Sequence, residues 1–126
     1  METSIFNTED AVKLEYKIWL SDSRGNGILG DGKWKILKLI EEKGSLKAAC
    51  DAMGYTYRRT WGDLQKIEET LGIPLLETHR GGAERGSMQL TEEGRKLVAA
   101  FDDFHAAADQ VIETEFRKLL ERLKQI

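Results

Sequence analysis

The chain has 126 residues, of which 40% are hydrophobic and 33% are charged, which is typical of one globular domain with a modest core. Its formal net charge of −3 argues against a protein that coats nucleic acid non-specifically, although a sequence-specific reader needs only a local positive field. No apolar run approaches the roughly 20 residues that a membrane helix needs, the N-terminus lacks a signal-peptide pattern, and Cys50 is the only cysteine. We therefore expect a cytoplasmic protein without membrane segments or disulfides, in which Cys50 is a buried structural thiol.

The N-terminal part predicts a small amount of β structure. Residues 14–20 alternate apolar and polar side chains, which is typical of a strand. Residues 21–27 have the composition of a turn, and residues 28–30 are expected to return as a short second strand.

A first helix is expected from Asp31, as its cap, to Lys43, with Gly44 ending it. Its apolar face consists of Trp34, Ile36, Leu37 and Ile40. The lysines on its other sides are expected either to hold phosphates or simply to keep the surface hydrated.

Residues 44–72 predict two helices joined by a tight turn. Ser45 suits an N-cap, and Gly54 follows the apolar stripe of the first helix, where a left-handed residue would end it. Thr56 can cap the second helix, and Gly72 and Pro74 stop it. The expected buried face of the second helix is Trp61, Leu64, Ile67 and Leu71. A short helix, a glycine-containing turn and a longer helix make a helix-turn-helix.

The second helix begins with Tyr57, Arg58 and Arg59, ahead of its apolar face. In a helix-turn-helix these N-terminal positions enter the DNA major groove, where arginine can bond two acceptors on a guanine edge. The alternative is that both arginines are solvated charges on an ordinary core helix. Gly62 costs about 1 kcal/mol of helix propensity relative to alanine, which either a close approach to DNA or close helix packing could justify.

A β-hairpin is expected after this helix, with strands at residues 75–80 and 87–90 around a glycine-rich loop. Arg80 and Arg85 flank the tip of this hairpin. The hairpin is therefore either a wing that approaches a phosphate or minor groove, or a surface hairpin without such a role.

The last helix begins at Thr91, as its cap, and runs to the C-terminus. Its apolar face is Leu97, Phe101, Phe104, Ala108, Val111, Ile112, Phe116, Leu119, Leu120 and Leu123. At ~1.5 Å per residue the helix would be about 50 Å long, more than one small domain covers. We expect a homodimer through this helix; the alternative is an intramolecular fold-back onto residues 1–14.

The sequence offers no constellation for catalysis or metal binding. His79 and His105 are far apart in sequence, and neither lies at a metal-ligand spacing from Cys50. There is no nucleophile elbow, paired CxxC motif or dinucleotide fingerprint. We therefore expect neither an enzyme nor a bound cofactor.

Five short motifs, in this order and at these spacings, resemble the DNA-binding part of ModE-type, molybdate-responsive regulators, which are related to the N-terminal domain of LysR-type regulators. The resemblance covers about residues 14–104. The motifs are Gly44-Ser45-Leu46-x-x-Ala49, Tyr57-Arg58-Arg59-x-Trp61, Leu71-Gly72-Ile73-Pro74-Leu75-Leu76, Arg80-Gly81-Gly82 and Leu90-Thr91-x-x-Gly94. The strand expected before the motif helices, and the Tyr-x-x-x-Trp pattern, look more like ModE than LysR.

The resemblance implies a winged helix-turn-helix that dimerises through terminal helices and binds a palindromic operator. The recognition-helix roles would fall on Thr56, Tyr57, Arg58, Arg59 and Lys66, and the wing roles on Arg80, Gly81 and Gly82. The sequence departs from the family in two places. Ala83-Glu84-Arg85 interrupts a wing tip that is richer in glycine and lysine in the family, and the chain stops before the C-terminal domains with which ModE proteins sense molybdate. We therefore expect a stand-alone DNA-binding version and carry over no molybdate site.

Together these patterns predict a mainly α fold with small β elements. Residues 1–91 are expected to form a winged helix-turn-helix domain with an N-terminal strand, and residues 92–126 a long dimerisation helix. The expected function is that of a homodimeric, sequence-specific transcriptional regulator of double-stranded DNA, with a recognition helix at about 56–71 and a wing at about 75–90. Two alternatives remain: a protein-interaction module on the same scaffold, and a regulator that binds a small molecule at the dimer interface.

Overall fold

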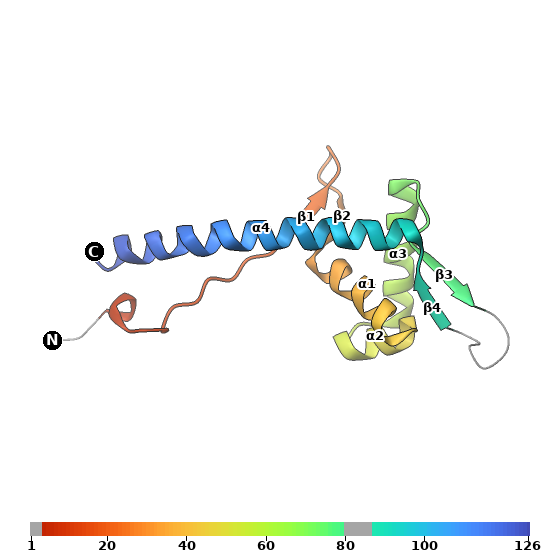
Figure 1. Cartoon of the computed structure of the whole chain (residues 1–126), viewed down its shortest axis with the longest axis horizontal. Helices are drawn as coiled ribbons and strands as arrows, with labels where there is room; N and C mark the ends of the chain where they lie inside the picture. Colours follow the sequence, from red (N-terminus) through yellow and green to blue (C-terminus); the bar gives the residue numbers. More distant parts are fainter. Residues whose placement is uncertain (1–3, 80–86) are drawn as a thin grey trace. The chain divides into compact units, whose positions relative to one another are not determined.

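The computed structural model of the chain describes residues 4–79 and 87–126 (Figure 1). The elements are η1 (Ile5–Asn7), β1 (Trp19–Ser21), β2 (Gly27–Gly30), α1 (Asp31–Lys43), α2 (Leu46–Met53), α3 (Tyr57–Leu71), β3 (Leu76–His79), β4 (Ser87–Leu90) and α4 (Glu92–Leu123). This mainly helical architecture with two small antiparallel hairpins confirms the predicted fold class. Of the helices in the described residues, none combines the length and apolar character that crossing a bilayer requires.

The chain divides into two compact units. One consists of Lys17–Phe101 and contains both hairpins, α1, α2, α3 and the first turns of α4. The other joins the N-terminal segment, up to Tyr16, to Asp102–Ile126 in the remainder of α4. The features predicted to bind DNA therefore all belong to the first unit.

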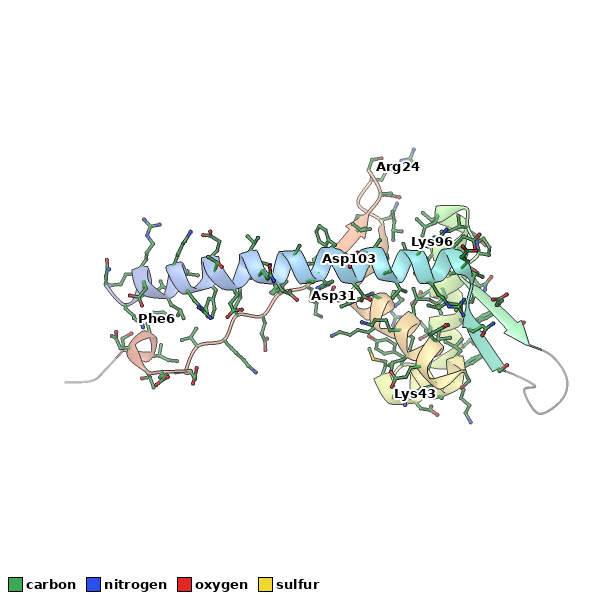
Figure 2. The ribbon with its side chains drawn as sticks, viewed as in Figure 1. Phe6, Arg24, Asp31, Lys43, Lys96 and Asp103 are labelled. Carbon is green, nitrogen blue, oxygen red and sulfur yellow. The ribbon has the colours of Figure 1, made fainter. Side chains whose placement is uncertain are left out.

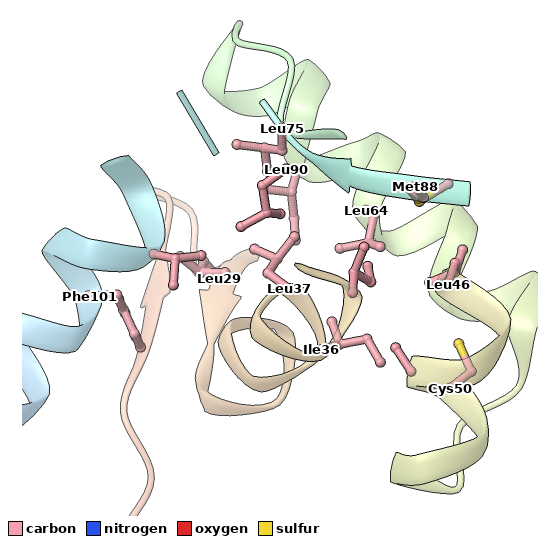
Figure 3. Close-up of a cluster of buried hydrophobic side chains, with 14 residues drawn as sticks. Leu29, Ile36, Leu37, Leu46, Cys50, Leu64, Leu75, Met88, Leu90 and Phe101 are labelled. Atoms are coloured by element: carbon pink, nitrogen blue, oxygen red, sulfur yellow. The ribbon is translucent and has the colours of Figure 1, made fainter. Parts of the chain in front are cut away.

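One hydrophobic core holds the Lys17–Phe101 unit together (Figure 3). Helix α1 supplies its centre, because Ile36, Leu37 and Ile40 are fully buried, as the apolar spacing predicts. The other helices, the strands and the segment before β3 surround this centre with Leu29, Leu46, Ala49, Cys50, Leu64, Ile67, Leu75, Met88, Leu90, Val98 and Phe101. The buried position of the Cys50 thiol confirms that it is a packing residue.

Helices α2 and α3 are joined by the tight turn that the sequence predicts. Ser45 caps α2, because its Oγ accepts a hydrogen bond from the backbone N–H of Ala48 at 3.0 Å. Gly54 ends α2 in the left-handed region with a φ of 71°, which a residue with a Cβ adopts only at a cost. Thr56 occupies the N-cap position of α3, although within the described residues its side chain makes no capping hydrogen bond.

Strands β3 and β4 form the predicted hairpin, in a register that pairs Leu76 with Leu90 and His79 with Ser87. Glu68 in α3 fixes the start of the hairpin. Its Oε2 accepts hydrogen bonds from the backbone N–H groups of Leu75 at 2.6 Å and Leu76 at 3.2 Å. The orientation of α3 is thereby coupled to the hairpin.

Strand β4 is also bonded to α1 and its C-terminal end. The backbone N–H of Met88 donates to the carbonyl of Gly44 at 2.8 Å. The Glu41 carboxylate accepts one hydrogen bond from the Leu90 N–H and one from the Arg95 guanidinium, each at 2.7 Å. Burial alone would raise the pKa of Glu41, but the two hydrogen bonds and the Arg95 charge outweigh it and hold the pKa below its usual value. Glu41 thus joins α1, β4 and α4 through an ionised group.

Helix α4 begins as predicted. Thr91 caps it, since its Oγ1 accepts from the Gly94 N–H at 2.9 Å and donates to the carbonyl of Pro74 at 2.6 Å. The Thr91 N–H also donates to the carbonyl of Leu75 at 2.9 Å. The first turn of α4 is therefore locked to the segment that leaves α3.

The strand predicted at residues 14–20 is wrong over most of its length. Strand β1 begins at Trp19, and in the described residues the preceding alternation has no partner strand, which a stable β conformation needs. The predicted return strand is confirmed as β2. The two strands approach closely, because a Cβ built on Gly30 would lie 2.7 Å from that of Trp19.

Asp31 is the first residue of α1 and not its cap, which is Gly30. Its carboxylate instead accepts a hydrogen bond from the Ile18 N–H at 3.2 Å, while its own N–H donates to the Ile18 carbonyl at 3.1 Å. This reciprocal pair continues the β1–β2 pairing by one residue, and the acidic side chain still suits the first turn of a helix.

In the unit that contains the C-terminal part of α4, some residues of the predicted apolar face are partly buried and others are exposed. The N-terminal segment belongs to this unit, as the fold-back alternative expects. Ile112, Phe116, Leu120 and Leu123 are partly buried there. Phe104, Val111 and Leu119, about two turns apart on one side of the helix, remain exposed.

Candidate nucleic-acid interface

Helix α3 presents one side of its N-terminal half to solvent. Thr56, Tyr57, Arg58 and Arg59 are all exposed, as is Lys66 two turns further on. None of these side chains is buried in the core. A predicted DNA contact requires such exposure.

The predicted buried face of α3 needs one correction. Leu64 and Ile67 are buried, but Trp61 is 38% exposed and Leu71 is 36% exposed, and Thr60 occupies the core position instead. The face that enters the core is thus Thr60–Leu64–Ile67, at spacings of four and three. Trp61 lies beside this face and is partly exposed, so its predicted place on the buried face is wrong.

Gly62 lies opposite the buried face of α3, one turn from both Arg58 and Lys66. Nothing in the described residues lies within 4 Å of a Cβ built on Gly62. Close packing within the described part of the chain therefore does not explain this glycine.

The charges around this face are predominantly positive. Arg58, Arg59 and Lys66 are exposed, and the nearby Asp63 forms a salt bridge with Lys33 of α1 at 3.2 Å. Pairing with Lys33 offsets the one acidic charge in the first three turns of α3. The resulting field suits an anionic partner despite the negative net charge of the chain.

The hairpin predicted as the wing is present, and its strands β3 and β4 agree with the predicted positions within one residue. The candidate residues at its tip, Arg80, Gly81, Gly82 and Arg85, lie outside the described residues.

The β1–β2 hairpin carries an ordered turn that sequence reasoning treated only as a connection. Asp22 organises it, because its Oδ1 accepts hydrogen bonds from the backbone N–H groups of Arg24 and Asn26, each at 2.9 Å. The side-chain hydrogen bond from Asn26, at 3.0 Å, is the main reason that the pKa of Asp22 is lowered. Arg24 projects from the tip of this turn (Figure 2). The Asp-x-x-Gly-Asn spacing could have indicated such a turn.

Within the described residues, no three His, Cys, Asp or Glu side chains lie together as metal ligands would. What the surface of α3 offers chemically is guanidinium and ammonium donors, two exposed aromatic rings and a gap at Gly62.

The chain is similar in sequence to several ModE and molybdenum-pterin-binding proteins. The chain is 28% identical over 97 residues to the molybdenum transport protein ModE of Azotobacter vinelandii, a match that covers 77% of this chain and 33% of that protein. It is 29% identical over 68 residues to the transcriptional regulator ModE of Haemophilus influenzae, covering 54% of this chain and 27% of that one. The chain thus spans about a third of the length of these relatives.

Among solved structures, the chain is similar to the crystal structure of the BenM DBD/benA site 1 DNA complex. The TM-score is 0.55 at 24% sequence identity, covering 68% of this chain and 94% of that one, and this likeness shows the winged-helix fold. The family model of bacterial regulatory helix-turn-helix proteins of the lysR family matches residues 33–95, which run from α1 into the first turn of α4 and are half of the chain. The chain therefore belongs to the lysR family of bacterial regulatory helix-turn-helix proteins.

Proposed function

We propose that the protein is a homodimeric, sequence-specific reader of duplex DNA that inserts the N-terminal half of α3 into the major groove. Membership of the lysR family makes it a DNA-binding transcriptional regulator and points away from an enzyme. A protein with this role works in the cytoplasm, where bacterial DNA lies. Which residues contact the DNA, and whether two chains bind together, is what we propose here.

The observation that carries the proposal is the exposed cationic face of α3. Arg58 and Arg59 stand in the first turn of the second helix of a helix-turn-helix, the part that reaches base edges in this motif. Lys66 follows about two turns later on the same side of α3, where its ammonium group could bind a phosphate. The hydrogen bonds that Glu68 accepts from the backbone N–H groups of Leu75 and Leu76 hold α3 and the hairpin in one orientation. A wing and a recognition helix that are fixed together can contact one stretch of duplex.

The proposed dimer rests on the exposed stripe of α4. Phe104, Val111 and Leu119 form an apolar surface that the chain's own N-terminal segment leaves uncovered. A second copy offers the same stripe, and a two-fold axis would bury both at once. The two α3 helices would then meet half-sites about 34–36 Å apart, or a multiple of that distance.

The decisive test is selection of bound duplexes from a random pool with the whole chain. We expect a palindromic consensus whose affinity falls steeply with added salt, because phosphate contacts release counterions. The mass of the protein in solution, measured by light scattering, should be that of two chains. A pool that yields no consensus would contradict sequence-specific DNA binding. A mass of one chain would contradict the proposed dimer.

A substitution at Gly62 separates the proposed role of this residue from its cost to the fold. Gly62→Ala should raise the free energy of unfolding by about 1 kcal/mol, since alanine favours the helix interior and the site is open. The same methyl should weaken binding to the selected duplex by about 1 kcal/mol or more, because it separates closely packed surfaces. Thermal unfolding and a binding titration measure the two effects. A stabilised variant with unchanged affinity would contradict an approach of DNA to Gly62.

A further inference from the structure

Two large aromatic side chains stand exposed on the recognition helix. Tyr57 is 51% exposed and Trp61 is 38% exposed. They are four residues apart on α3, so their side chains are neighbours on one side of the helix, with Cβ atoms about 5–6 Å apart. We call this pair the aromatic ridge. Neither residue belongs to the buried face of α3, which consists of Thr60, Leu64 and Ile67.

The surroundings of the aromatic ridge identify the charge of its partner. Arg58 is adjacent to Tyr57 in sequence, and Gly62 follows Trp61. Arg59 and Lys66 are also exposed, but they lie on the opposite side of α3 from the aromatic ridge. The Asp63 carboxylate is paired with Lys33 at 3.2 Å. An exposed apolar pair beside an arginine, on a helix whose N-terminal half carries mostly positive charge, suits a partner that is anionic overall and yet offers apolar groups.

Duplex DNA meets this description in a particular way. In the major groove the base edges present hydrogen-bond donors and acceptors, and the 5-methyl group of thymine is the single apolar group. Arginine, glutamine or lysine side chains can use the donors and acceptors, but a tyrosine or tryptophan ring mainly offers apolar area.

We propose that Tyr57 and Trp61 pack against thymine methyl groups and so set a preference for thymine in each half-site; this rests on the proposed insertion of α3 into the major groove. The gap at Gly62 supports it. Without a side chain at this central position, the helix can come near enough to the base edges for rings on its flank to reach methyl groups. Arg58 then reads guanine or phosphate beside the thymines.

The test uses the unmodified chain and the duplex selected from the random pool. Each thymine of one half-site is replaced in turn by deoxyuridine, which removes the methyl group and leaves base pairing and hydrogen-bonding groups unchanged. We expect affinity to fall about fourfold at each thymine that the aromatic ridge contacts, the effect of losing one buried methyl group. The same replacement at thymines outside both half-sites should cause no change.

Variants then assign the effect to the two rings. With Tyr57→Ala or Trp61→Ala, the ratio of affinities for the thymine and deoxyuridine duplexes should fall to one at the position contacted by that ring. Tyr57→Phe keeps the ring and should keep the ratio. Leu71→Ala is the matched control, because Leu71 is similarly exposed, at 36%, but stands at the far end of α3. It should leave every ratio as in the unmodified chain.

The outcomes separate this inference from the proposed function. A selected consensus whose affinity is the same with thymine and deoxyuridine at every position would overturn the thymine preference and leave DNA binding standing. Ratios that persist in both alanine variants would overturn the role of the aromatic ridge. A pool that yields no consensus fails the proposed function itself. The deoxyuridine scan needs only the unmodified chain. It therefore tests the thymine preference even if Trp61→Ala folds poorly.

Discussion

Replacing the arginine that reads a base with alanine should lower affinity for the selected duplex by about 1–3 kcal/mol, or roughly 5- to 150-fold. Arg58 and Arg59 are the two candidates, both exposed in the first turn of α3. The loss should be confined to one position of the half-site, where the variant accepts any base, because a bidentate contact to guanine is what discriminates there. Titrating each variant against the consensus and all single-base changes measures both effects.

Lys66→Ala is the contrasting variant. Lys66 is exposed on the same helix, and if it binds a phosphate its loss should weaken matched and scrambled duplexes alike and reduce the slope of affinity against salt. Should Arg58→Ala and Arg59→Ala both behave in that uniform way, neither arginine reads a base and the assignment is wrong.

Gly94→Ala should destabilise the fold by about 1–3 kcal/mol, as overpacking of a tight site does. A methyl group on Gly94 would overlap the backbone carbonyl of Leu75. That carbonyl accepts the hydrogen bond from the Thr91 N–H at 2.9 Å, so moving it disturbs the junction of β3 with α4. In a unit of this size each kcal/mol lowers the midpoint of thermal unfolding by about 4–8 °C.

The same glycine-to-alanine change at Gly62 is the control, because that site is open and the change there should raise the midpoint. Both substitutions lie inside helices, so a difference in sign between them isolates the contact with Leu75. A Gly94→Ala protein that unfolds at the original temperature would show that the backbone around Leu75 adapts without cost.

The caps and glycines made most of the helical framework predictable. Ser45, Gly54 and Thr91 cap their helices through their own backbone neighbours, so the sequence nearby is enough to predict the cap. The β3–β4 hairpin was predictable for the same reason, since its loop and alternating strands are continuous in sequence. Membership of the lysR family agrees with the motifs that these elements carry.

Features that depend on distant partners were not predictable. Asp31 looked like a cap, but a hydrogen bond to Ile18, thirteen residues earlier, uses its carboxylate. Trp61 fitted the apolar stripe of α3 on periodicity alone, yet the smaller Thr60 fills the core and leaves the indole partly exposed. A helical pattern fixes which side chains share a side, and only the neighbouring elements decide which side is covered. The roles proposed for Thr56, Lys66 and the wing residues stay predictions.

Glu68 of α3 accepts hydrogen bonds from the backbone N–H groups at the start of the β3–β4 hairpin, and the Met88 N–H of that hairpin donates to the Gly44 carbonyl after α1. These bonds tie α3 and the hairpin to the rest of the unit. If α3 and the hairpin stay in this fixed arrangement on binding, the DNA has to deform to fit the protein. The double helix would then curve to meet two rigid faces. Base pairs between the half-sites, which no side chain touches, would influence affinity through their stiffness, and easily bent steps there would strengthen the complex.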